Sequence, residues 1–280
     1  MNKCILCGCT EWEMLFEGVV KCPHCGYVAA DLSMNEDQVH GLYNRSYFFG
    51  GEYADYIKEK KSLQKNFRLR MKALKNFLDP LRHRRLFEIG CAYGFFLDIA
   101  RGHFDDVQGI DITEEGIHHA RKRLGLDVTH GDFIKHDFGG RKFDVVCLWD
   151  TVEHLHNPVL YLEKISKHVD RGGLIALTTG DIGSINARLR KEKWRLFHPP
   201  THLHYFSKKT IGEMLNHHGF EILYHKYCGS YRSFENMAYN VLVLRQKGSA
   251  LYSLLRKARV TGFHIYLNLY DIMYVIARKR

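Results

Sequence analysis

Four cysteines near the amino terminus are the clearest candidates for metal chemistry. They form two Cys-x-x-Cys pairs, Cys4 with Cys7 and Cys22 with Cys25, and fourteen residues separate the pairs. Two such pairs bring four thiolates into a tetrahedron around Zn²⁺, as in a zinc ribbon. Because four thiolates leave no coordination position open, we expect this zinc to be structural rather than catalytic.

A glycine-punctuated turn, Glu88-Ile-Gly-Cys-Ala-Tyr-Gly94, follows an apolar strand and precedes an apolar helix expected to begin near Phe95. Gly90 and Gly94 lack a Cβ, so the backbone can turn tightly and approach a ligand. The helix would point its first amides into this turn. The arrangement is typical of a nucleotide-type cofactor site at the carboxyl edge of a parallel sheet, although Ala92 departs from the G-x-G-x-x-G fingerprint.

Carboxylates follow the next two expected strands. Residues 106–111 form the second strand and end in Asp111. A carboxylate at that position can accept hydrogen bonds from both hydroxyls of a ribose. The third strand, residues 127–130, is followed by Asp132, which is either a ligand contact or a simple turn residue. Its register with Asp111 favours the ligand contact.

Histidines lie beyond the fourth and fifth strands, and histidine suits proton removal near neutral pH. The fourth strand, residues 143–149, leads into Asp150-Thr-Val-Glu-His154. A second group, His198, His202 and His204, follows the fifth strand. Because His202 and His204 are two residues apart, an extended chain would turn both to the same side.

Alternating strands and helices must position these residues. The strands after the glycine turn are expected at 106–111, 127–130, 143–149, 174–179, 220–226 and 271–278. The turn Arg171-Gly-Gly173 precedes the strand at 174–179. This rhythm predicts an α/β fold with a doubly wound sheet. Before the sheet lie an aromatic-rich segment, 42–56, and a charged helical stretch, 57–78. The tyrosines of the aromatic-rich segment either cover the cofactor or pack the zinc ribbon against the sheet.

The order and spacing of these motifs resemble the class I S-adenosylmethionine (SAM)-dependent methyltransferases. The resemblance is to the branch of ubiquinone-type O-methyltransferases and of methyltransferases from glycan and deoxysugar gene clusters. The segments that match are 88–94, Gly109-Ile-Asp111, Gly131-Asp132, 149–158, Arg171-Gly-Gly173, 194–207 and Gly219-Phe220. The resemblance implies a Rossmann-like seven-stranded sheet whose last two strands are antiparallel, with a small N-terminal zinc ribbon.

The resemblance also implies SAM as the methyl donor. It places Gly90 and Gly94 around the methionine part, Asp111 on the ribose, Asp132 on the adenine, and Asp150 near the methionine end. The full set of expected cofactor residues is Glu88, Gly90, Cys91, Gly94, Asp111, Ile112, Asp132, Phe133 and Asp150.

An alcohol acceptor must lose a proton as the methyl group is transferred. By resemblance His154 is the first candidate base, and His202 is the second. In ubiquinone-type relatives an acid–histidine pair at this place is near the acceptor, so Glu153 and His154 are also candidates to hold a divalent metal. The alternative for His154 is a hydrogen-bonded structural histidine at the start of a helix.

Three parts are expected: a zinc ribbon (1–35), an aromatic and helical cap segment (36–80) and a methyltransferase domain (81–280). The domain would carry a helical insertion at about 229–270, before the last strand. Apolar residues at helical spacing over 234–241 and 251–258 predict two helices there. The insertion is interpreted as a lid or dimer contact. The alternative is an interfacial helix pair that contacts a lipid-linked substrate at a membrane.

The formal net charge of +10 favours anionic partners, and residues 245–259 hold five basic residues and no acidic one. No apolar run reaches the ~18 residues of a membrane span, and the first residues lack the apolar region of a signal peptide. We therefore expect a cytoplasmic protein, with peripheral contact at the inner membrane surface as an option. Its cysteines are expected to be metal ligands or free thiols.

The predicted function is methyl transfer from SAM to a small-molecule or glycan acceptor. O-methylation of a sugar hydroxyl on a nucleotide- or lipid-linked intermediate is favoured. The alternatives are C-methylation of a keto-sugar, an RNA methyltransferase, and a non-catalytic scaffold that keeps the SAM fold. Nucleic acid is disfavoured as a partner because the chain has no Lys/Arg-rich arm interleaved with aromatic residues.

Overall fold

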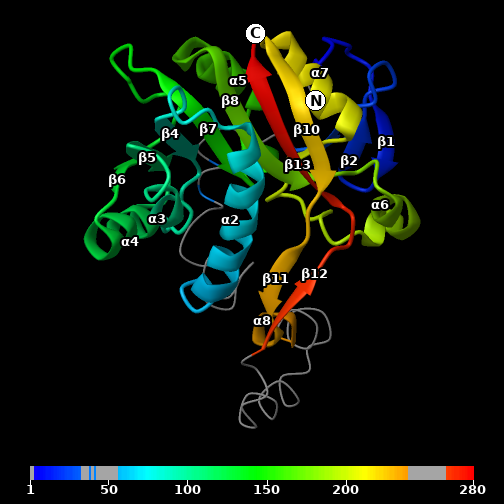
Figure 1. Ribbon diagram of the computed structural model, residues 1–280. Coiled ribbons are helices and arrows are strands. Elements are labelled where there is room, and N and C mark those ends of the chain that lie inside the picture. Colours follow the sequence, from blue (N-terminus) through cyan, green and yellow to red (C-terminus); the bar gives the residue numbers. More distant parts are fainter. Residues whose placement is uncertain (1–2, 33–37, 39–40, 42–55, 239–262) are drawn as a thin grey trace.

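A seven-stranded mixed sheet forms the centre of the molecule (Figure 1). The structure is a computed structural model that describes residues 3–32, 38, 41, 56–238 and 263–280. The strands are β4 (Arg85–Ile89), β5 (Asp106–Asp111), β6 (Asp127–His130), β7 (Phe143–Trp149), β8 (Val169–Gly180), β10 (Phe220–Tyr227) and β13 (Ile272–Lys279). Their order across the sheet is β10-β13-β8-β7-β4-β5-β6, and β13 pairs antiparallel with both of its neighbours. The predicted seven-stranded α/β sheet is confirmed.

Apolar residues cover both faces of the sheet, as a central parallel strand requires. On β7, Val145 and Cys147 belong to one buried cluster, and Val146 and Leu148 belong to the other. The first cluster includes residues of α2 (Lys60–Leu74), α3 (Leu97–Ala100) and α4 (Glu114–Leu124). The second includes residues of α5 (Pro158–His168) and α7 (Lys208–His217). The sheet is therefore enclosed between two helical layers.

Short helical elements complete the connections between the strands. One of them, η2 (Lys75–Phe77), precedes β4, and the others are η3 (Val152–His154), α6 (Ile185–Arg190), η4 (Lys191–Lys193) and α8 (Phe234–Ala238). Side-chain caps define two of the helix starts. Asn157 accepts a hydrogen bond from the Val159 amide at the start of α5, and Ser184 accepts one from the Ala187 amide at the start of α6.

A second sheet contains the N-terminal strands β1 (Glu13–Phe16), β2 (Val19–Lys21) and β3 (Val28–Ala30). Its fourth strand, β9 (His204–Tyr205), comes from the far side of the sequence and pairs antiparallel with β3. The sequence did not predict β3 or this pairing. The N-terminal module is therefore joined to the main domain by backbone hydrogen bonds.

Two differences from the predicted bounds affect the turns between strands and helices. Strand β8 begins at Val169, so the expected turn at 171–173 lies inside the strand, where the register with β7 shifts. The helix expected to begin near Phe95 begins at Leu97 and is four residues long. It is too short to provide the array of N-terminal amides that the sequence suggested.

The insertion before the last strand contains a β-hairpin in addition to helix. Strands β11 (Ser230–Ser233) and β12 (His264–Leu267) pair antiparallel, and Figure 1 shows them extending away from the main sheet. Helix α8 coincides with the start of the first predicted helix. The second predicted helix (251–258) and residues 42–55 of the aromatic segment lie outside the described residues. Among the helices that the structure describes, none has the length and apolar character needed to cross a membrane.

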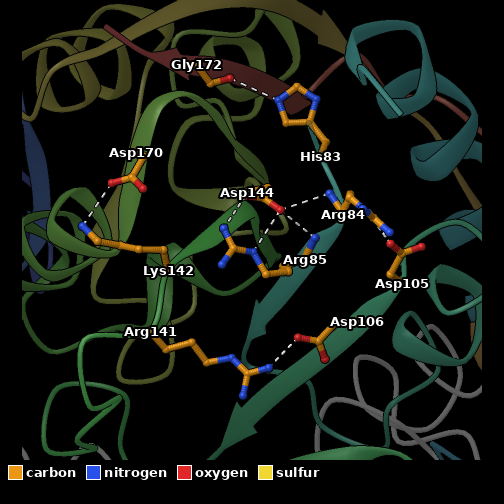
Figure 2. A network of polar contacts seen from close by, with 10 residues as sticks. All are labelled: His83, Arg84, Arg85, Asp105, Asp106, Arg141, Lys142, Asp144, Asp170 and Gly172. Carbon is orange, nitrogen blue, oxygen red and sulfur yellow. Dashed lines mark hydrogen bonds and ion pairs between the residues drawn. The ribbon is translucent and has the colours of Figure 1, made fainter. Parts of the chain in front are cut away.

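Polar contacts tie together the amino ends of the parallel strands (Figure 2). Asp144 accepts hydrogen bonds from the backbone amides of Arg84 (3.0 Å) and Arg85 (2.8 Å), and from the Arg85 guanidinium (Nη2–Oδ1, 2.8 Å). Arg141 pairs with Asp106 at 2.5 Å. Because these contacts lie at the edge opposite to the glycine turn, we assign them to stability rather than to function.

Candidate functional site

A cavity of about 280 Å³ opens at the carboxyl edge of the sheet. It is lined from the turn after β4, the end of β5, the loop after β7, helix α2, segment 195–202 and strand β11. Its lining includes Arg70, Gly90, Ala92, Asp111, Ile112, Phe133, Trp149, Asp150, Thr151, Glu153, His154, Arg195, His198, His202 and Arg232.

The turn after β4 approaches the loop after β7 closely at Gly90. A Cβ added at Gly90 would lie 2.7 Å from the Thr151 side chain, and the φ angle of Gly90 is +77°. Ala92 has a φ of +44°, which is unusual for a residue with a side chain. Its amide donates to Asp111 Oδ2 at 2.7 Å. This hydrogen bond holds the turn against the end of β5.

Two buried carboxyl groups lie beneath this turn. Asp111 also accepts a hydrogen bond from the Thr113 amide at 2.8 Å. Burial raises the pKa of Asp111, and the hydrogen bonds from Thr113 and Ala92 oppose that shift. Glu88 is 2% exposed, and its Oε2 has no hydrogen-bond partner among the described residues. Burial and the nearby charge of Asp111 raise the pKa of Glu88 well above its ordinary value.

The structure brings only part of the predicted cofactor set to the cavity. Gly90, Asp111, Ile112, Phe133 and Asp150 line it, and Glu88, Cys91, Gly94 and Asp132 do not.

The residues outside the lining have packing or turn contacts instead. A Cβ at Gly94 would meet Leu126 at 2.6 Å, so its small size serves packing. Asp132 accepts hydrogen bonds from the Ile134 amide (2.6 Å) and the Tyr161 hydroxyl (3.1 Å). Cys91 and Cys147 are buried, as expected of small apolar residues.

An ion pair that sequence reasoning missed lies in the cavity wall. Arg70 Nη2 donates to Asp150 Oδ2 at 2.6 Å, and the Arg70 side chain is 10% exposed. Thr178 donates its hydroxyl to the other oxygen of Asp150 at 2.8 Å. Arg70 lies in a helix rich in lysine and arginine, so nothing in the local sequence distinguishes it from its solvent-exposed neighbours.

Three histidines are in ring contact beside the cavity. The ring centroids of His154 and His202 are 4.6 Å apart, and those of His198 and His202 are 3.8 Å apart. His154 Nδ1 lies 2.8 Å from the Thr201 carbonyl, and His202 Nδ1 lies 2.9 Å from the Leu196 carbonyl. Since a carbonyl only accepts, each Nδ1 carries the proton, and each neutral ring keeps its lone pair on Nε2.

Glu153 lies against this cluster and is 5% exposed. Side-chain ligand atoms of Glu153, His154 and His202 all lie within 4.8 Å of one another. Burial and the charge of Asp150 raise the pKa of Glu153 to about 8. Burial lowers the pKa of His154 to about 4, although its hydrogen bond to Thr201 opposes the shift. Near neutral pH, the site therefore combines a protonated carboxyl group with neutral imidazoles.

His204 does not face this cluster, so the prediction that His202 and His204 share one side was wrong. His204 Nε2 lies 2.7 Å from the Leu155 carbonyl, and Nδ1 contacts the Tyr27 hydroxyl.

The four N-terminal cysteines converge on one point. Cys4 Sγ lies 3.6 Å from Cys25 Sγ, and Cys7 Sγ lies 3.6 Å from Cys22 Sγ. All four sulfur atoms lie within 4.8 Å of one another. Gly8 and Gly26, which follow the two pairs, have φ angles of +76° and +80° and donate their amides to the Cys4 and Cys22 carbonyls. The two pairs therefore form matching tight turns.

Comparison with known proteins shows which families and enzymes this chain resembles. The profile of the family described as "Methyltransferase domain" matches residues 61–225. A ubiquinone biosynthesis O-methyltransferase of Cereibacter sphaeroides is 30% identical over 105 residues, which cover 36% of this chain and 42% of that protein. A dTDP-3-amino-3,4,6-trideoxy-alpha-D-glucopyranose N,N-dimethyltransferase of Streptomyces venezuelae is 25% identical over 134 residues, covering 46% and 53%. The chain thus spans about half, or less, of the length of these curated relatives.

Solved structures share the fold. The magnesium protoporphyrin IX methyltransferase of Synechocystis PCC 6803, solved with bound SAH, has a TM-score of 0.57 at 15% identity; the match covers 88% of this chain and all of that one. A SAM dependent methyltransferase of Archaeoglobus fulgidus has a TM-score of 0.54 at 18% identity, with 80% and 99% covered. Because the family profile matches more than half of the chain, from α2 into β10, this protein belongs to the methyltransferase domain family.

Proposed function

We propose that this protein transfers a methyl group from SAM to a small-molecule or glycan acceptor, with a sugar hydroxyl on a nucleotide- or lipid-linked intermediate as the favoured acceptor. The observation that carries the proposal is that one cavity is lined both by the Gly90 turn with Asp111 and by His154 with His202. Donor and base would therefore share one space, as an in-line transfer requires. Membership of the methyltransferase domain family supports SAM as the donor.

The residues around the Gly90 turn fit SAM. The missing Cβ at Gly90 lets the turn pack against Thr151 at the wall of the cavity, and Asp111 can accept hydrogen bonds from the ribose hydroxyls. Phe133 offers an apolar face for the adenine. SAM carries a sulfonium and an ammonium group, and the carboxylate of Asp150, which lines the cavity, would favour these cations. In this assignment Gly94 and Cys91 shape the turn, Ile112 flanks the ribose, and Asp132 orients the loop of Phe133.

SAM supplies an electrophilic methyl group, so the protein needs to align the acceptor and receive its proton. We assign the proton to Nε2 of His154, because Nδ1 of this ring is already bound to the Thr201 carbonyl. His202 is the second candidate for this role, and its Nδ1 is fixed in the same manner. The lowered pKa of His154 keeps the ring neutral at physiological pH and also makes it a weaker proton acceptor than an ordinary histidine.

Glu153, His154 and His202 also fit a divalent metal, since a carboxylate and two imidazoles are a common ligand set. A metal there would lower the pKa of an acceptor hydroxyl. Methyl transfer measured with and without a chelator separates this role from that of a metal-free base.

The four cysteines fit a structural zinc ion. A tetrahedron with Zn–S bonds of about 2.3 Å has S···S edges of about 3.8 Å, close to the two separations of 3.6 Å. We propose a zinc ribbon at 1–35, a cap segment at 36–80 and a methyltransferase domain at 81–280. Replacing Cys22 by Ser should remove the zinc and destabilise the N-terminal sheet while SAM binding persists. A fully zinc-loaded variant would contradict the ribbon.

The decisive experiment is calorimetric titration of SAM and S-adenosylhomocysteine (SAH) into the purified chain, with metal content measured on the same sample. Micromolar binding of both, with one zinc per chain, supports the proposal. Transfer of labelled methyl groups is then tested on nucleotide sugars, lipid-linked glycans presented on vesicles, keto-sugars and RNA. Absence of SAM and SAH binding in a folded, zinc-loaded protein would favour the non-catalytic scaffold.

A further inference from the structure

Two arginines that have no role in the assignments above line the same cavity. Arg195 follows the short helix η4, and Arg232 lies on β11. Both guanidinium groups are permanently charged at physiological pH. A charged group in the wall of a cavity is stable only where an anion or water compensates its charge.

Arg195 is held in place by a buried carboxylate. Its Nη2 donates to Asp271 Oδ1 at 2.9 Å, and Asp271 is 1% exposed. The other oxygen of Asp271 accepts from Trp194 Nε1 (2.9 Å) and Asn186 Nδ2 (2.7 Å). Arg195 Nε is buried and has no acceptor among the described residues. Asp271 therefore holds one edge of the guanidinium group, and the Nε–H donor has no acceptor in the described protein.

Arg232 is positioned by two contacts of β11, one with a neighbouring strand and one with a side chain of α2. It stands opposite Ile265 of β12, and the side chain of Asn66 on α2 exchanges two hydrogen bonds with the backbone of the preceding residue, Tyr231. Figure 1 shows α2 and β11 converging at this end of the molecule. Within the described part of the chain, no carboxylate forms an ion pair with Arg232.

Arg232 adds a second positive charge to a cavity wall in which Arg195 already has Asp271 as its ion-pair partner. Burial lowers the pKa of Arg195, Asp271 opposes the shift, and the charge of Arg232 lowers it further. The two guanidinium groups repel each other, and an anion bound in the cavity would offset this repulsion. The segment that leads to the cavity, residues 188–195, carries five basic residues and one acid, which attracts anions toward this region.

We propose that Arg195 and Arg232 form a subsite for a phosphate or diphosphate group carried by the methyl acceptor. Guanidinium groups match the oxygens of phosphate with paired, charge-assisted hydrogen bonds. The subsite rests on the proposed function in one respect, namely that its ligand is part of the acceptor. It restricts the substrate class to phosphorylated molecules, with the methylated hydroxyl near His154 and the phosphate at the two arginines.

The test uses the full chain in metal-free buffer and inorganic pyrophosphate as the probe, with binding measured by calorimetry. Wild type is compared with Arg232→Gln and Arg195→Gln, and with Arg188→Gln as the matched control. Arg188 is an exposed residue of the same basic segment and does not line the cavity. We expect Arg232→Gln to weaken pyrophosphate binding at least ~10-fold and Arg188→Gln to change it less than ~2-fold.

Arg195→Gln leaves Asp271 without its cation and can unfold the protein, so Arg232→Gln decides the outcome. Equal binding of pyrophosphate by wild type and Arg232→Gln, or no binding by wild type, would overturn the subsite. SAH binding is measured on the same samples, and a failure of the proposed function is seen there independently. UDP-glucose and a short prenyl diphosphate are then compared; tighter binding of either, lost in Arg232→Gln, supports the subsite and identifies the source of the diphosphate.

Discussion

The hydroxyl of Tyr27 donates a hydrogen bond to Nδ1 of His204, and this contact joins the N-terminal module to the loop that carries the site. His204 Nε2 in turn donates to the Leu155 carbonyl at 2.7 Å. A second link lies beside it, because Leu203 accepts from the Ala30 amide and donates to the Glu153 carbonyl, both at 2.9 Å. The N-terminal module is thereby part of the support of Glu153 and its neighbours.

Replacing Tyr27 by Phe should lower both stability and turnover. The substitution leaves Nδ1 of a buried imidazole without its donor, which costs about 1–3 kcal/mol. Turnover should fall because the loop of Glu153 and Leu155 loses a support, while SAH affinity should stay unchanged. Denaturant unfolding and calorimetry measure the two effects. Tyr270→Phe, at a residue that is 65% exposed, is the control, and equal stability of the two variants would contradict the link.

Replacing Asp111 by Asn should weaken SAM binding by about 10- to 100-fold. Because Ala92 and Thr113 donate to different oxygens of Asp111, the variant keeps an acceptor for only one of these amides, and it loses the charge that strengthens hydrogen bonds to the ribose. Calorimetry gives the affinity, and circular dichroism checks that the fold is retained. Unchanged SAM affinity would show that the ribose lies elsewhere.

Replacing His154 by Ala should reduce turnover by about 10²- to 10⁴-fold with SAH affinity intact, as expected for the loss of a general base. The same substitution at His202 is the comparison, because the two rings are in contact. A large loss in His202→Ala together with normal turnover in His154→Ala would move the base to His202. Normal turnover in both variants would remove the histidines from the chemistry.

The sequence predicted the sheet well where strands are apolar and bounded by turn residues. The bounds 106–111, 127–130 and 143–149 all agree with β5, β6 and β7. Strand β7 is buried inside the parallel sheet, so its apolar composition alone distinguishes it from the surrounding helices and loops, whereas β6 is an edge strand that was bounded by the turn residues around it. The short strands β3 and β9 were missed because their stability comes from pairing across the sequence rather than from a local pattern.

The site was predicted only in part for the same reason. Arg70 and Asp150 lie eighty residues apart and meet only because α2 packs across the end of β7. Arg195 and Arg232 likewise come from separate segments, and neither stands in a motif. Gly94, by contrast, stands in a motif, but its small size serves packing against Leu126, a distinction that residue type cannot reveal.

Replacing Ala92 by Gly should stabilise the protein by up to about 1 kcal/mol. Ala92 has a φ of +44°, a conformation that costs a residue with a Cβ about 1–2 kcal/mol, and the greater freedom of glycine in the unfolded chain offsets part of the gain. Urea unfolding at pH 7 measures the difference. Ala73→Gly, inside α2, is the matched control and should destabilise by about 1 kcal/mol. Destabilisation by Ala92→Gly would mean that the turn carries no strain.

Replacing Asp144 by Asn should destabilise the protein at neutral pH by about 1–3 kcal/mol, because charge-assisted hydrogen bonds to Arg84 and Arg85 are weakened (Figure 2). Although burial acts to raise it, these hydrogen bonds hold the pKa of Asp144 below its ordinary value of 3.8. A carboxyl group with a depressed pKa stabilises the fold above the unfolded pKa, and the stabilisation is lost as pH falls through the folded pKa. The difference in unfolding free energy between wild type and variant should therefore be constant from pH 7 to about pH 5 and shrink below about pH 4. A difference independent of pH would show that packing, rather than the charge of Asp144, holds the amino ends of β4 and β7 together.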